Sequence, residues 1–265
     1  IQPKDPKHMR MVSEENALYI AKKAVANAGA IGSQFELDWE YVTLQKVNDK
    51  LVYAIPFDFA GFFPWKNTEG TPGYIVVDAE DPERAPKFIE SPKGKLLRYM
   101  PAAFFGSNLE RHMRENGFLD TGLGHPRFEL DEEGGAHWII PLFKPMLGWS
   151  APKILGVATV DPVTGDIKRY KIEDAPKWID RVFSAGIIES YVDWRGEYSS
   201  GWLNATFSKK GVTEGERPIF VHGADDKAVW VTGVTSKSSK DDSLIGLMYT
   251  DSHTEVAKMR QWVIR

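Results

Sequence analysis

Cysteine is absent from this chain of 265 residues. Its absence excludes disulfide bonds, thiolate metal sites and a cysteine nucleophile. The sequence also lacks an apolar run near the ~18 residues that a membrane-spanning helix requires, and it shows no signal-peptide pattern. No block of Lys and Arg stands out, and 33 basic residues against 37 acidic ones leave a net charge of −4. Nucleic acid is therefore not an expected partner.

Hydrophobic and aromatic residues, by contrast, are plentiful. Hydrophobic residues make up 42% of the chain and charged residues 26%, with nine Trp and fourteen Phe. This balance is typical of a folded protein with a substantial core, and it leaves aromatic side chains over for contacts. The chain begins with Ile rather than Met. We therefore expect a processed form or an excised fragment, from which a signal or membrane anchor could have been lost.

A six-residue pattern recurs along the chain. Each copy reads Gly, four mostly apolar or β-branched residues, then Asp: GYIVVD (73–78), GVATVD (156–161) and GLMYTD (246–251). Val, Ile and Tyr favour strands, while Gly, Pro and Asp favour the turns that bound them. The second copy continues as DPVTGD (161–166), the pattern of a type I turn. Each copy is therefore predicted to be a strand that leads into a turn and a further strand.

The residues upstream of each copy favour a true repeat. The first two copies follow a strand-like segment that has an aromatic residue, two further residues and then Pro, and the third has Gly in place of Pro. These pairs are Tyr53 and Pro56, Trp138 and Pro141, and Trp230 and Gly233. The alternative is that β-hairpins merely look alike.

Segments with a helical pattern lie ahead of the predicted strands. Residues 13–29 begin at Ser13, a good N-cap, and end at Gly29, a typical helix stop. Residues 107–117 likewise begin with a Ser and end with a Gly, over a shorter length. Residues 176–204 are predicted to contain one or two helices. The chain therefore reads as helix and strands, three times in succession.

The second copy with its flanks, GVATVDPVTGDIKRY (156–170), resembles the PepSY module. The first copy matches more loosely, because Glu80–Pro82 replace the usual Thr-Gly turn, and the third copy diverges further. The resemblance implies small α+β units of the kind found mostly outside the bacterial cytoplasm. We accordingly expect an α+β fold of two to three repeated units, each a helix with an antiparallel sheet, over residues 1–105, 106–175 and 176–265.

Tandem PepSY-like repeats imply inhibition, regulation or holding of a partner rather than catalysis. We expect a non-catalytic binding or regulatory module, the extracytoplasmic part of a membrane-tethered protein of bacteria or their phages. Its expected partner is an envelope or membrane protein, and it would reach the membrane only through a segment absent from this chain. The alternative is a structural or assembly protein of an envelope complex or phage particle. An unrecognised hydrolase is the third hypothesis.

Residues able to support catalysis or metal binding do not form a recognised motif. Ser150 and Lys153 have a Ser-x-x-Lys spacing, but Pro152 between them disfavours the helical turn that this chemistry requires. The six His are scattered, with no pair at the spacing of a helical zinc site. Paired acids such as Asp78 and Asp81 fit a turn better than two carboxyl groups facing across a cleft. No metal and no cofactor are expected.

Aromatic residues in the connections between strands are the best candidates for a functional site. Phe62, Phe63 and Trp65 lie in a connection rich in Gly and Pro, and Met146 and Trp149 lie in the matching place of the second unit. Loops carry function more often than cores do, and exposed aromatics anchor interfaces. These five residues are predicted to bind the partner. The alternative is that they fold back over their own sheets and cap the core.

Overall fold

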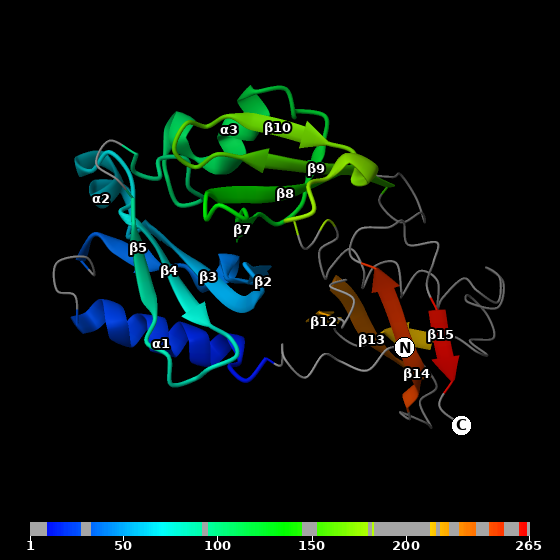
Figure 1. Cartoon of the computed structure of the whole chain (residues 1–265). Helices are drawn as coiled ribbons and strands as arrows, with labels where there is room; N and C mark the ends of the chain where they lie inside the picture. Colours follow the sequence, from blue (N-terminus) through cyan, green and yellow to red (C-terminus); the bar gives the residue numbers. More distant parts are fainter. Residues whose placement is uncertain are drawn as a thin grey trace.

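The computed structural model describes residues 10–27, 33–91, 95–144, 153–179, 182, 213–215, 218–222, 228–236, 244–251 and 260–263. Within these ranges the chain forms three α-helices and fifteen β-strands (Figure 1). The helices are α1 (Glu14–Asn27), α2 (Phe62–Asn67) and α3 (Leu109–Glu115). None of them is long and apolar enough to cross a membrane.

The strands form three five-stranded antiparallel sheets that share one connectivity. In each sheet the third strand along the chain pairs with the first, second and fourth, and the fourth pairs with the fifth. The first sheet contains β1 (Phe35–Leu37), β2 (Thr43–Val47), β3 (Lys50–Phe59), β4 (Gly73–Asp78) and β5 (Lys87–Glu90). The second contains β6 (Gly122–Leu123), β7 (Arg127–Leu130), β8 (Ala136–Lys144), β9 (Lys153–Val160) and β10 (Ile167–Tyr170). The third contains β11 (Thr213–Gly215), β12 (Ile219–His222), β13 (Ala228–Ser236), β14 (Leu244–Asp251) and β15 (Arg260–Val263).

The register between the third and fourth strands is also the same in the three sheets. Each Gly-x4-Asp pattern lies along the fourth strand, and the aromatic residue upstream sits opposite the residue just before the aspartate. These pairs are Tyr53 with Val77, Trp138 with Val160, and Trp230 with Thr250. The recurring letters of the sequence therefore correspond to one recurring strand pairing.

The α+β class predicted from the sequence, with a helix in every unit, is wrong. The described residues are mostly antiparallel β-sheet, and their α-helices span only 14, 6 and 7 residues. The predicted helices over 13–29 and 107–117 correspond to α1 and α3, but residues 176–179 contain a turn, and residues 183–204 lie outside the described ranges. The physical reason is that strand residues supply most of the buried core, so the sheets need little helix to cover them.

Helix α1 covers one face of the first sheet (Figure 1). Ser13 begins the helix, because its hydroxyl accepts a hydrogen bond from the Asn16 amide at 3.2 Å. Ala17 and Ala21 are one turn apart and fully buried, so they form the face that packs on the sheet. Their small side chains allow the helix to approach the strands closely.

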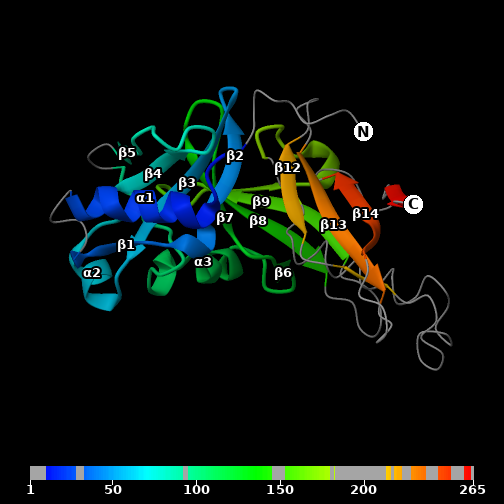
Figure 2. The same cartoon turned by 90° about the horizontal axis from the view of Figure 1, so that it is seen from below.

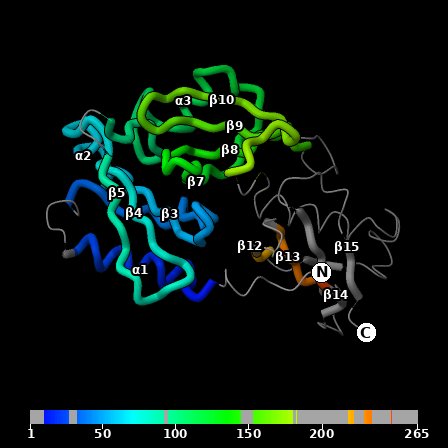
Figure 3. Tube along the Cα trace, in the orientation of Figure 1, coloured from blue at the N-terminus to red at the C-terminus, as the bar shows by residue number. Residues whose placement is uncertain are grey.

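The second sheet is buried on both faces. Along β8, Trp138 and Ile140 belong to the core shared with the first sheet, whereas Ile139 points to the opposite side. There it joins a smaller cluster that includes Phe220 and Trp230 of the third sheet. Figure 2 shows β8 and β9 between the first sheet and β12–β14, and Figure 3 traces the chain through the same arrangement.

Aromatic rings and a buried amide join the first sheet to the second. The Phe128 ring lies 5.4 Å from the Tyr74 ring and 5.2 Å from the Trp138 ring, measured between ring centres. The Gln45 side-chain oxygen accepts a hydrogen bond from the Leu130 amide at 2.9 Å. These contacts fix the first and second sheets relative to each other.

Candidate functional site

Aromatic side chains from two separate segments gather beyond the end of β3. We call Phe62, Phe63, Trp65, Phe104 and Phe105 the aromatic cluster. The Trp65 ring lies 5.6 Å from the rings of Phe104 and Phe105, and Phe62 lies 5.2 Å from Phe104. At these separations aromatic rings attract one another in tilted and edge-to-face arrangements. The cluster therefore joins α2 to the segment that precedes α3.

The aromatic cluster is open to solvent on one side and packed on the other. Phe63 is 72% exposed and Phe105 60% exposed, whereas Trp65 is half-buried and packs against the core. Three of the five residues predicted to bind a partner, Phe62, Phe63 and Trp65, thus lie together here. Trp65 also covers part of the core, as the alternative interpretation of these residues expects. The other two, Met146 and Trp149, lie outside the described residues.

The second segment of the cluster is held in place by Asp58. This carboxylate is buried and accepts hydrogen bonds from the amides of Phe59, at 2.8 Å, and Ala102, at 2.9 Å. Burial raises the pKa of Asp58 to about 7, because the charged form loses water. Phe105 has a φ of +52°, a conformation that a bulky residue adopts only where its surroundings enforce it. Phe104 and Phe105 are therefore presented by a fixed segment.

An open cavity of about 420 Å³ borders the aromatic cluster at Trp65. Its lining includes two cationic side chains, Lys66 and Arg98, and one carboxylate, Glu69. The aromatic surface therefore has a charged rim, which is the usual composition of a protein interface.

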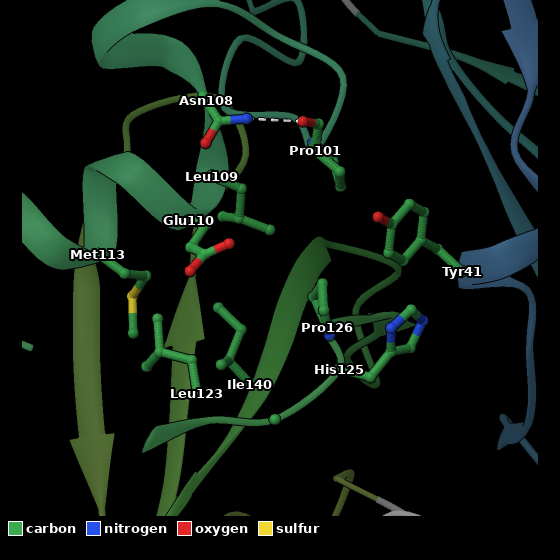
Figure 4. A pocket seen from close by; sticks show the side chains of 11 residues that line it. Tyr41, Pro101, Asn108, Leu109, Glu110, Met113, Leu123, His125, Pro126 and Ile140 are labelled. Atoms are coloured by element: carbon green, nitrogen blue, oxygen red, sulfur yellow. Dashed lines mark hydrogen bonds between the residues drawn. The ribbon is translucent and has the colours of Figure 1, made fainter. Parts of the chain in front are cut away.

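A second pocket, of about 380 Å³, lies where the first sheet meets the second (Figure 4). We call it the interface pocket. Its floor is apolar and consists of side chains from α3, β6 and β8, namely Leu109, Met113, Leu123 and Ile140. Tyr41, from the 3-10 helix Trp39–Tyr41 that follows β1, forms the opposite wall with His125.

Tyr41 and His125 form a stacked pair in this wall. Their rings are 5.1 Å apart and within 9° of parallel, and the Trp138 ring meets Tyr41 edge-on at 5.3 Å. His125 Nε2 lies 3.0 Å from the carbonyl oxygen of Glu40. A carbonyl only accepts, so Nε2 carries the hydrogen and donates it.

The surroundings of Tyr41 keep its hydroxyl protonated. Burial is the main cause that raises the pKa of Tyr41, and the nearby carboxylates of Glu40, Asp38 and Asp58 raise it further. Glu110 reaches the pocket from α3 (Figure 4). The pocket thus offers a neutral phenol, an imidazole and one carboxylate above an apolar floor.

The acidic residues noted in the sequence as a turn are a turn in the structure. Asp78 accepts hydrogen bonds from the amides of Glu80, at 2.9 Å, and Asp81, at 3.0 Å, and it pairs with Arg84. Asp161 accepts from the Val163 amide at 2.7 Å in the equivalent turn of the second sheet. Within the described part of the chain, no group of three or more His, Asp or Glu side chains is placed to hold a metal ion.

Several residues of both sites were missed by the analysis of the sequence. Phe104 and Phe105 stand as a pair before a glycine, a local signal similar to that of Phe62 and Phe63. Tyr41 and Glu110 carry no such signal. They meet only because the first sheet packs against the second.

Comparison with known proteins gives little beyond the structure itself. No protein-family model matches the chain, and no curated protein matches it. Among solved structures, a glycoside hydrolase family 43 arabinoxylan arabinofuranohydrolase from Bacillus subtilis, in complex with cellotetraose, is similar with 14% identity and a TM-score of 0.24. The match covers 84% of this chain and 35% of that one. A TM-score of this size does not establish a shared fold.

Proposed function

We propose that this chain is a non-catalytic binding module, the extracytoplasmic part of a membrane-tethered envelope protein, and that it holds a protein partner through the aromatic cluster. The observation that carries the proposal is the exposure of Phe63 and Phe105, at 72% and 60%, in a cluster whose Phe62 and Phe104 are also exposed and whose Trp65 packs against the core. Large rings on a fixed backbone lose little entropy when a partner covers them, so they serve as anchors of interfaces.

The charged rim supports a role in recognition. Lys66, Arg98 and Glu69 lie in the cavity beside the half-buried Trp65, so a partner that covers the rings also meets two cations and one carboxylate. Rim charges mainly set the orientation and the rate of association, while buried rings supply most of the affinity. A partner with acidic groups around an apolar patch fits this surface.

We favour binding over hydrolysis, the third function considered, because of how the carboxylates of Glu110 and Asp78 are placed. Glycoside hydrolysis commonly uses two carboxyl groups facing each other ~5–10 Å apart. The described lining of the interface pocket brings one carboxylate there, that of Glu110. Asp78 is engaged by the amides and the arginine of its own turn.

A capture experiment tests the proposal. The immobilised chain is incubated with a membrane extract of the source cell, beside the double variant Phe63→Ser/Phe105→Asn. Asn tolerates the backbone conformation of residue 105, so the fold is preserved. We expect the variant to retain less than about a tenth of the partner, since two anchors each contribute more than ~1 kcal/mol.

The matched control is Tyr19→Ser/Leu119→Ser, which removes two exposed side chains on other parts of the surface. It should capture the same identified protein as the parent. Equal capture by both double variants, with unchanged circular dichroism, would contradict a role for the aromatic cluster.

A structural or assembly role is the second candidate, and strand β5 favours it. All four residues of β5 are exposed, including Phe88 and Ile89, and the strand lies at an edge of the first sheet. An exposed edge strand presents unpaired backbone groups to another chain. If assembly is the function, sedimentation should show oligomers of the parent that dissociate in Ile89→Lys. A monomeric parent at all accessible concentrations would exclude assembly through this edge.

A further inference from the structure

The interface pocket has the size and position of a small-molecule site. Its volume of about 380 Å³ lies in the ~300–1,000 Å³ range of ligand pockets. Tyr41 belongs to the segment between β1 and β2 of the first sheet, whereas the other walls come from the second sheet and α3. The pocket therefore forms only when the two sheets are packed against each other (Figure 4). Sites between packed layers are preferred locations for ligands.

The floor of the interface pocket accepts an apolar body. Leu109, Met113 and Ile140 are almost fully buried, and their side chains line the floor together with Leu123. The thioether of Met113 is flexible and adapts to ligands of different shape. Leu109, Met113 and Ile140 are already out of water, so the apolar surface removed on binding is that of the ligand itself and of the half-buried Leu123.

The electrostatics of the interface pocket are one-sided. Glu110 is the acidic side chain among the described residues that line it, and no Lys or Arg is among them. Arg114 meets Glu110 at 3.3 Å through Oε1, so Oε2 is the oxygen that a ligand would meet. The carboxylates of Glu40 and Asp38 lie close enough to Tyr41 to act on its charge. The potential at this wall is therefore negative.

The aromatic wall favours the same kind of ligand. His125 stacks on the Tyr41 ring and Trp138 packs against it, so the neutral Tyr41 hydroxyl is the group that accepts a hydrogen bond from an ammonium group. Figure 4 shows Tyr41 and His125 on one side of the pocket and Glu110 on the other, with the floor residues Met113, Leu123 and Ile140 near Glu110. An anion would find no Lys or Arg among the described lining residues.

We propose that the interface pocket binds a small amphipathic organic cation, an amine whose apolar body lies on the floor and whose ammonium group meets Glu110. This site is separate from the aromatic cluster, and its occupancy does not depend on the partner proposed above. Because Tyr41 and α3 contribute opposite walls, the bound amine would also stabilise the contact between the two sheets.

Three probes with the same apolar body test the preference for charge. These are 3-phenylpropylamine, 3-phenylpropanol and 3-phenylpropionate, titrated by calorimetry into the intact chain at neutral pH. We expect the amine to bind about threefold to fivefold more tightly than the alcohol and the carboxylate, because the Glu110 side chain is 70% exposed and an exposed ion pair contributes less than one decade of affinity. The His125 ring resonances should shift on binding, which locates the site.

Glu110→Gln tests the residue that defines the preference, and Glu115→Gln is its control. Glu115 lies on the same helix and pairs with Arg111 at 2.7 Å, outside the lining of the pocket. We expect about a threefold to fivefold loss of amine affinity in Glu110→Gln, since its side chain is 70% exposed, and less than about a 1.5-fold change in Glu115→Gln. Equal binding of the three probes, equal effects of the two variants, or no binding of the amine up to millimolar concentration would overturn the proposal.

Discussion

Asp58 places a carboxyl group out of contact with water at the point where β3 leads toward the aromatic cluster. Two backbone amides stabilise its charged form, yet burial outweighs them and raises its pKa from 3.8 to about 7. One of these amides belongs to Ala102, two residues before Phe104. The protonation of a single buried group is therefore linked to the segment that carries half of the exposed rings.

The stability of the protein should fall as the pH rises through 7 because of Asp58. Its pKa in the folded state lies above the unfolded value, so the folded chain holds a proton that the unfolded chain releases. This contribution is complete below about pH 4 and is lost through about pH 7. Between about pH 5 and pH 8 we expect the parent to lose about 2–3 kcal/mol that Asp58→Asn does not lose. Urea unfolding at the two pH values measures the difference, and parallel pH profiles would contradict it.

At the scale of the element, the repeated Gly-x4-Asp strand has a physical cause at each end. Gly73 and Gly156 have φ angles of +141° and +140°, and a Cβ at either position would overlap a carbonyl oxygen of the neighbouring edge strand. At the other end, Asp78 and Asp161 accept amide hydrogen bonds in the following turn. The pattern therefore marks a strand that must pass close to its neighbour and then reverse.

Gly156→Ala should destabilise the second sheet strongly. The added methyl group meets the Tyr170 carbonyl oxygen, and alanine is strained at this φ. We expect a loss of about 2–4 kcal/mol in the free energy of unfolding. Gly106→Ala is the matched control, since a Cβ there meets nothing within 4 Å and no positive φ is involved. Chemical denaturation of the two variants checks the contrast, which similar losses would refute.

At the scale of the whole molecule, two adjacent side chains of β8 are buried in two different cores. Ile140 is buried in the core shared with the first sheet, and Ile139 is buried in the cluster that contains Phe220 and Trp230. Two chemically identical residues thus support different contacts of the second sheet. The larger core joins the two sheets that form the interface pocket.

Ile139→Ala and Ile140→Ala should loosen different parts of the molecule. Each truncation is expected to cost about 2–4 kcal/mol, because a buried side chain is replaced by a cavity. Hydrogen exchange should accelerate in β13 in the Ile139 variant and in β3 in the Ile140 variant. The same pattern of exchange in both variants would show that the two cores unfold as one.

Prediction from the sequence was most successful where one segment carries the whole signal. The Gly-x4-Asp strands and the helix that begins at Ser13 both follow from local spacing and residue type. The α+β class was wrong because short helical patterns were given the same weight as strands. The relative amount of helix depends on how much of the core the sheets bury between them. That burial cannot be read from any single segment of the sequence.

The positions where strands recur, and the residues that turn the chain between them, can be read from local residue patterns alone. Backbone geometry imposes these choices locally, as at Gly156 and Asp161. Only the tertiary structure decided that Phe104 and Phe105 meet Trp65, and that Tyr41 and Glu110 line one pocket. These residues are distant in the chain, and the packing of one sheet on the other, a property of the whole set of buried side chains, brings them together.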